Sequence, residues 1–167
     1  SVQHLRVGGR LNDAGQYEAA LESFERAIRV RERLAESDPS SGRARRDLAF
    51  AQYFAGSSLL ALGRAEDALD RFEPMLMTFT QRVEDNPSSA RAQRDLATAH
   101  EMVGKAKAGS GDPAGALRHY HAFAETIDPL EAHDPSNLQY LALAALSRVR
   151  LAETAVALDA VSYTHLR

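Results

Sequence analysis

The sequence feature that most constrains the fold is a repeat with a period of 48 residues. A glycine, an Ala-Leu pair five residues later and an aromatic residue nine residues after the glycine occur three times, starting at Gly15, Gly63 and Gly111. Residues 11–58 and 59–106 align without a gap and share 19 identical residues in 48 positions. Repetition at this period predicts a row of similar supersecondary units, each packing on the next.

The same period sets where helices are expected to begin and end. Pro39, Pro87 and Pro135 each follow an Asp or Asn, and a proline disfavours helical geometry in the residue before it. Ser40 or Ser41 is a natural N-cap for the helix that follows. Apolar residues recur at helical spacing between these points, and no alternating β-branched segment occurs. We expect only helices, over residues 1–14, 16–36, 42–62, 65–84, 90–108, 114–132 and 138–160.

Two further prolines fall inside expected helices. An interior proline removes a backbone hydrogen bond and clashes with the preceding turn. We therefore expect the helix over 65–84 to kink at Pro74, and the helix over 114–132 to bend or shorten near Pro129.

The repeated residues resemble the tetratricopeptide repeat, a helix–turn–helix unit that stacks into a superhelix. In that family a small residue of the first helix meets a small residue of the second. The matching positions are the first-helix residues Gly8, Gly56, Gly104 and Ala152, the second-helix residues Ala20, Ala68 and Ala116, the three turn glycines, and the aromatics Phe24, Phe72 and Tyr120.

The resemblance covers residues 1–160 and implies an all-α, right-handed superhelical solenoid. Its helix pairs would span about 1–36, 42–84 and 90–132, followed by the lone helix over 138–160. The usual unit has 34 residues, so each helix here is expected to be longer by about two turns. The bulky early residue of the family is replaced by His4, Gln52, His100 and Arg148.

The same resemblance implies a function. Long repeats of this type are similar to those of bacterial multidomain signalling proteins, and the family binds protein or peptide partners in a concave groove lined by the first helices. The lysine–asparagine pair that clamps a C-terminal carboxylate in some members is missing, because Leu5 and Gly9 occupy its first two places. The groove positions fall here on Phe50, Tyr53, Phe54, Ser57, Thr98, Glu101, Lys105, Leu146, Val149 and Glu153.

Three aromatic residues of this set lie on one expected helix. Phe50, Tyr53 and Phe54 are not needed by the inward apolar stripe of that helix, and exposed aromatic residues often anchor binding surfaces. Lengthened neighbouring helices would instead cover them as core. The sequence favours neither alternative.

Arginines cluster at the start of the first helix in two successive repeats. Clustered guanidinium groups suit carboxylate or phosphate ligands, so a stacked ridge would be a candidate anion site. Asp47 and Asp95 lie four residues after Arg43 and Arg91 and could neutralise them, which makes a solvated face the favoured interpretation. The ridge would contain Arg43, Arg46, Arg91 and Arg94, with Arg45 beside them.

Other chemistry finds little support in the sequence. No motif for a catalytic nucleophile or a phosphate-binding loop occurs in its required context. His119 and His121 point about 200° apart on a helix, so one metal ion cannot use both, and surface histidines are expected. The net charge of −3 and the absence of cysteine argue against nucleic acid, an anionic membrane and thiolate metal sites. We expect a cytoplasmic, non-enzymatic protein with no cofactor.

Both ends of the chain have unusual features. The sequence starts at Ser1, and its final residues, 161–167, resemble one reading frame of a sequencing-library adapter. We expect a non-native tail there, on a fragment of a bacterial gene from metagenomic DNA whose repeat array ends near Ala160. The favoured interpretation is a non-enzymatic binding scaffold that forms part of a larger protein, and two alternatives to it stay open. The repeats could be the regulatory region of a larger signalling enzyme such as a serine/threonine kinase, or could sense a small anion through the arginine ridge.

Overall fold

The computed structural model describes residues 2–164, with side chains described for residues 2–159. Within that part the chain forms helices and no strand, which confirms the all-α prediction. The first six helices match the predicted bounds within one residue, and the seventh runs four residues past Ala160; residues 165–167 of the expected tail lie outside the described residues. The helices are α1 (Val2–Asp13), α2 (Tyr17–Ser37), α3 (Gly42–Ala61), α4 (Ala65–Asp85), α5 (Ala90–Gly109), α6 (Pro113–His133) and α7 (Leu138–Thr164).

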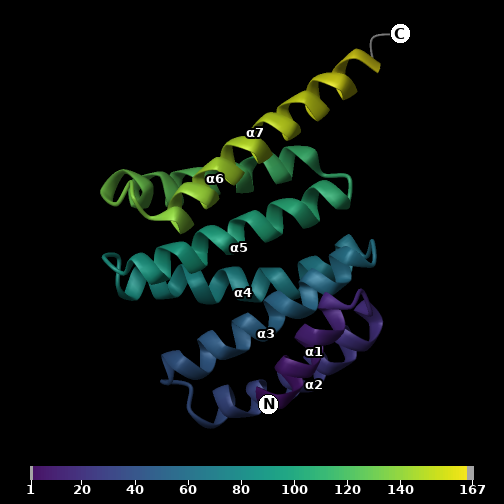
Figure 1. The fold of residues 1–167 in the computed structure, drawn as a ribbon, viewed down its shortest axis with the longest axis vertical. Coiled ribbons are helices and arrows are strands. Elements are labelled where there is room, and N and C mark those ends of the chain that lie inside the picture. Colours follow the sequence, from purple (N-terminus) through teal and green to yellow (C-terminus); the bar gives the residue numbers. More distant parts are fainter. Residues whose placement is uncertain (1, 165–167) are drawn as a thin grey trace.

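The helices stack in chain order. Each one packs against the helix before it and the helix after it, and Figure 1 shows them layered from α1 and α2 at one end to α7 at the other. Some contacts skip a helix: α1 touches α3, and α3 touches α5, while ion pairs join α5 to α7 and α2 to α4. The odd-numbered helices therefore share one face of the stack, and the even-numbered helices lie behind them (Figure 1).

Three identical turns fix the repeat. Gly15, Gly63 and Gly111 have φ angles of 72°, 73° and 83°, in the left-handed region that glycine adopts without strain. At the first of these turns the Gln16 amide donates to the Leu11 carbonyl at 2.8 Å, so the last helical carbonyls are satisfied as in a glycine C-cap. The same bond pattern recurs at the other two turns, and each reverses the chain in the same way.

Side-chain caps begin α3, α5 and α7. The hydroxyl oxygens of Ser41 and Ser89 accept from the amides of Ala44 and Ala92 at 3.2 Å. Of the two candidates for the N-cap of α3, Ser40 and Ser41, the structure therefore identifies Ser41. In the third repeat Asn137 takes this place and accepts from the amides of Gln139 and Tyr140. A different residue type performs the same capping.

The interior prolines do not end their helices. α4 continues through Pro74 to Asp85, and α6 continues through Pro129 to His133, so Pro129 does not shorten its helix. Both rings are exposed, and the carbonyl that each deprives of a donor lies on the same side. Water can satisfy these carbonyls, which explains why the helices continue.

The closest contact between paired helices joins a glycine to an aromatic ring. A Cβ built on Gly56 would lie 2.3 Å from Cε1 of Phe72, and Gly8 and Gly104 meet Phe24 and Tyr120 in the same way. The three atoms nearest to each of these glycines belong to the ring. Ala20, Ala68 and Ala116 of the second helices are fully buried, and their expected meeting with the glycines stays a prediction. Because glycine has no side chain, a large ring of the next helix can pack against its backbone.

Apolar clusters lie between successive helices rather than at one centre. One joins α2 to α3, the largest joins α3, α4 and α5, and a third joins α5, α6 and α7. Stability is then a sum over neighbouring interfaces. The pattern leaves α7 with an uncovered side, because no described element packs beyond it. Its exposed residues include Leu138, Leu141, Val149 and Val156, and Ala152 at the fourth glycine position is also exposed. None of the helices described is long and apolar enough to cross a bilayer.

The glycine–aromatic contact predicts a sharp difference between two glycines. Gly56→Ala forces a methyl group into the Phe72 ring, and we expect a loss of about 1–3 kcal/mol of unfolding free energy. Gly9 is also helical, but its Cβ would meet nothing within 4 Å, so Gly9→Ala should be neutral or stabilise by up to about 1 kcal/mol. Urea unfolding followed by circular dichroism measures both. Equal effects of the two substitutions would contradict the packing described here.

Candidate functional site

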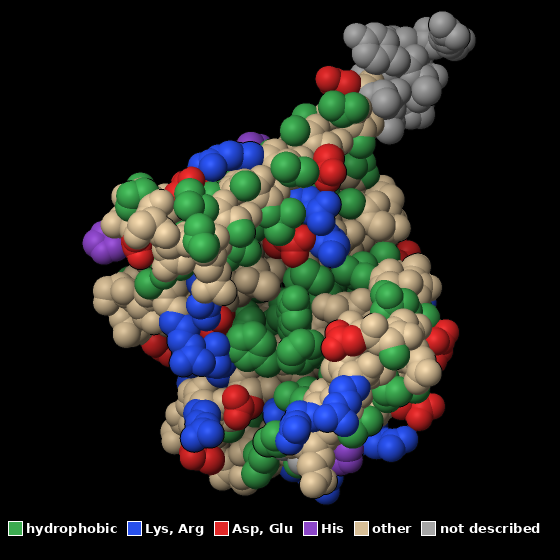
Figure 2. Space-filling model, in the orientation of Figure 1, with side chains coloured by type: hydrophobic (Ala, Val, Ile, Leu, Met, Phe, Trp, Pro, Cys, Tyr) green, Lys and Arg blue, Asp and Glu red, His purple; other side chains and the backbone are tan. Residues whose placement is uncertain are grey.

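The face shared by the odd helices contains a hollow. Figure 2 shows hydrophobic side chains gathered at its floor, between α3 and α5, with basic side chains along one edge. We call this hollow, with the residues of α3, α5 and α7 that border it, the groove. The sequence-predicted groove residues come from all three helices: Phe50, Tyr53, Phe54 and Ser57 from α3, Thr98, Glu101 and Lys105 from α5, and Leu146, Val149 and Glu153 from α7.

The α3 aromatics belong to the core and to the surface at once. Phe50 and Tyr53 are partly buried and pack against the central apolar cluster, with the Phe50 and Phe79 ring centroids 5.4 Å apart. Phe54 is 37% exposed and stacks on Phe24, again at 5.4 Å. Tyr53 and Phe54 meet edge to face. The rings are therefore part of the core and also keep part of their surface exposed, and a role of that surface in binding stays a prediction.

A charged network joins α5 to α7 at the other side. Glu101 is only 7% exposed, and its Oε1 lies 3.5 Å from Nε of Arg150, which also pairs with Glu153 at 3.0 Å. Burial raises the pKa of Glu101, while the nearby charges of Lys105 and Arg150 oppose that shift. Glu101 thus holds α5 and α7 together and has little surface to offer a ligand. Lys105, Arg150 and Glu153 border a pocket of about 320 Å³ beside it.

The remaining predicted groove residues differ in how much they can contribute. The hydroxyls of Ser57 and Thr98 donate to carbonyls of their own helices, Tyr53 at 2.8 Å and Arg94 at 3.0 Å. They are therefore already partnered. Val149 is 49% exposed and accessible for contact, whereas Leu146 packs against the cluster between α5 and α7.

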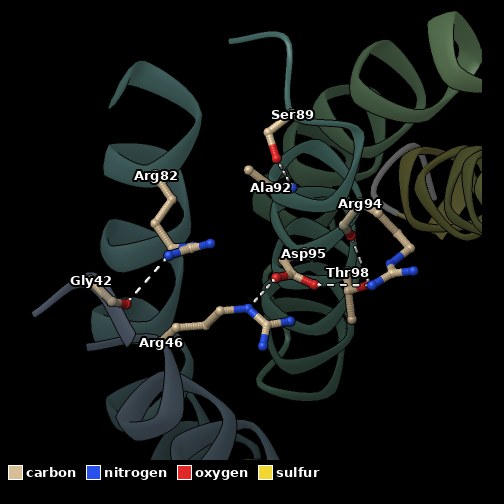
Figure 3. Close-up of polar contacts among 8 residues, drawn as sticks. All are labelled: Gly42, Arg46, Arg82, Ser89, Ala92, Arg94, Asp95 and Thr98. Carbon is tan, nitrogen blue, oxygen red and sulfur yellow. Dashed lines mark hydrogen bonds and ion pairs between the residues drawn. The ribbon is translucent and has the colours of Figure 1, made fainter. Parts of the chain in front are cut away.

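The predicted arginine ridge is divided by Asp95. This carboxylate is 4% exposed and accepts a hydrogen bond from Nε of Arg46 at 2.9 Å. A guanidinium nitrogen of Arg94 forms a second ion pair with it at 3.6 Å (Figure 3). The expected pairing of Asp95 with Arg91 is wrong, because stacking brings Arg46 from the preceding repeat closer. The ion pair expected between Arg43 and Asp47 does not form either. The Arg46 guanidinium also lies 4.4 Å above the Phe50 ring centroid, so it borders the groove.

One arginine of the site was missed by sequence reasoning. Arg82, near the end of α4, donates from Nη1 to the Gly42 carbonyl at 3.3 Å (Figure 3). The repeat contained a signal: the equivalent positions 34 and 130 are both leucine, so Arg82 departs from its own pattern. A pocket of about 440 Å³ between α3, α4 and α5 brings these side chains together, lined by Arg43, Arg46, Asp47, Arg82 and Arg91.

The histidines are arranged differently from the prediction. His119 is not a surface residue: it is half-buried between helices, with its Nδ1 3.2 Å from Nδ1 of His100, whereas His121 and His133 are exposed. Burial lowers the pKa of His100 to about 4 and lowers that of His119 as well. Among residues 2–159 no group of three or more His, Asp or Glu side chains could hold a metal ion.

Comparison with known proteins adds no assignment. A scan against models of protein families finds none that matches this chain, and a search of curated proteins finds no match either. The site is therefore interpreted from its own residues.

The His100–His119 pair predicts a pH-dependent stability. Both pKa values lie below the unfolded value of about 6.5, so the unfolded chain binds protons first and stability is lost as pH falls below 6.5. Allowing for partial exposure, we expect a loss of about 1 kcal/mol between pH 7 and pH 5. His100→Gln, which introduces the residue found at the equivalent position 52, should remove most of this loss. Urea titrations at both pH values test it, and identical pH slopes would contradict the assignment.

Proposed function

We propose that this protein is a non-enzymatic interaction scaffold that binds a peptide or protein segment in the groove. The proposal includes a right-handed, tetratricopeptide-like superhelical arrangement, in which α3, α5 and α7 line the concave side. The observation that carries it is the partly exposed aromatic layer of α3, which is fixed from behind by core contacts. The resemblance of the repeat to the tetratricopeptide family supports the same conclusion.

A prearranged aromatic surface favours binding for an energetic reason. A ligand that contacts Phe54 does not have to order that ring, because Phe24 and Tyr53 already hold it. Association then loses less side-chain entropy, and more of the apolar contact energy appears as affinity. Large, partly exposed aromatic rings of this kind are frequent centres of binding energy.

The charges around the groove would orient the ligand. Arg46 lies at one end of the aromatic layer, over Phe50, and the Glu101–Arg150–Glu153 network lies toward α7. Opposite charges on a peptide would be attracted to different ends, which fixes its direction more than its affinity. A segment with an apolar centre and an acidic group toward Arg46 fits this arrangement best.

A peptide-library selection tests the proposal. Random 12-residue peptides selected on the intact chain should yield binders whose affinity falls about tenfold or more in Phe54→Ala, because an aromatic anchor is lost. Met77→Ala is the matched control, since Met77 is 73% exposed on α4, behind the groove, and should change affinity less than twofold. Fluorescence anisotropy measures both, and thermal melts verify that both variants stay folded.

Two results would contradict the proposal. In one, no peptide is enriched on the folded chain. In the other, the selected peptides lose as much affinity in Met77→Ala as in Phe54→Ala, which would place binding on the opposite side of the stack.

A further inference from the structure

The pocket at the basic edge of the groove has an excess of positive charge. Four arginines and one aspartate line it, which leaves three positive charges uncompensated among the lining residues. Counting the pairing of Arg46 with Asp95 still leaves an excess of two. No carboxylate in the described part of the chain lies within ion-pair distance of Arg43, Arg82 or Arg91.

Arg82 is the residue that the fold least explains. The equivalent side chains are Leu34, which is 53% exposed, and Leu130, which is 6% exposed in a core cluster. A leucine therefore satisfies the packing at this position in both other repeats. In Arg82 the Nε atom is buried and has no hydrogen-bond acceptor, and a buried donor without a partner is destabilising. Since leucine fills this position in both other repeats, packing gives no reason for an arginine here, and its positive charge is what distinguishes it.

Arginines from three helices approach the pocket. Arg43 and Arg46 start from α3, Arg82 from α4 and Arg91 from α5, and Figure 3 shows Arg46 and Arg82 extending into the same space between α4 and α5. The Nε atom of Arg46 donates to Asp95, while its two terminal nitrogens have no hydrogen-bond acceptor among the described residues. The acidic residue of the pocket is Asp47. Burial lowers the pKa of Arg31, and the negative charge of Asp47 opposes this shift. Arg31 therefore balances part of the charge of Asp47.

We propose that this pocket binds the phosphate group of a phosphorylated residue in the peptide that occupies the groove. The inference rests on the proposed function. A phosphate monoester carries close to two negative charges and three strong acceptor oxygens, which match several unpaired guanidinium groups better than one carboxylate does. Arg46 connects the two sites, because it lines the pocket and also lies over Phe50 in the groove.

Three degenerate peptide pools test this on the intact chain. Each contains nine residues, randomised except for a central phosphoserine, serine or glutamate, and binding is measured by fluorescence anisotropy at constant ionic strength. We expect the phosphoserine pool to bind about tenfold or more tightly than the serine pool. Arg82→Leu and Arg91→Gln introduce residues found at the equivalent positions 130 and 139. Both should reduce this preference to twofold or less without changing the affinity of the serine pool.

A charge-matched control and the groove variant separate the possible results. Arg118→Leu removes an exposed arginine of α6 and should leave the preference intact. Phe54→Ala should weaken the phosphoserine and serine pools by the same factor. If Phe54→Ala changes neither pool while Arg82→Leu abolishes the preference, the groove proposal fails and the phosphate pocket stands.

Other outcomes would overturn the phosphate assignment itself. These are equal binding of the phosphoserine and serine pools, a preference that survives Arg82→Leu and Arg91→Gln, or a glutamate pool that binds as tightly as phosphoserine. Inorganic phosphate that binds as tightly as the phosphoserine pool would show that the pocket recognises free phosphate and not a peptide.

Discussion

The contact between a glycine and an aromatic ring is the interaction on which the rest of this structure depends. It occurs at Gly8, Gly56 and Gly104, each against the ring that follows 16 residues later. Because a glycine has no side chain, the ring of the next helix can lie against its backbone, and this sets the distance within each helix pair. The left-handed glycine between them sets the direction of the reversal. Repeating both at a constant period keeps the odd helices on one face, where α3 and α5 meet and the groove forms.

The candidate sites lie where the sequence departs from its own repeat. Phe50 and Phe54 of α3 become Thr98 and Met102 in α5, and Arg82 of α4 stands where two leucines stand elsewhere. Repeated positions have to satisfy the same packing in every unit, so they are constrained by stability. Positions that change between units are not held to one residue type by the repeat, so they can serve recognition as well as packing. A groove and a basic pocket that meet at Arg46 follow from such departures.

The sequence predicted local structure well because local residues determine it. Turn glycines, prolines and caps fixed the ends of six helices within one residue. It failed for contacts that depend on how helices stack. Asp95 pairs with Arg46 from 49 residues away, and His119 meets His100 across a helix interface. Neither pairing follows from spacing along one helix. Arg82 could have been identified from the sequence, because it departs from the repeat. That it lines one pocket with Arg43 and Arg91 could only be seen once the helices were stacked.

The central claim is that the repeat places the odd helices on one face, and that this face binds a peptide. Amide hydrogen exchange in the presence of a selected peptide tests this claim most directly. Protection is compared between the free and the peptide-saturated protein, helix by helix. The account predicts added protection in α3 and α5, which supply the aromatic layer and its opposite wall, with little change in α2, α4 and α6. Protection gained mainly in the even helices, or equally in all helices, would contradict it.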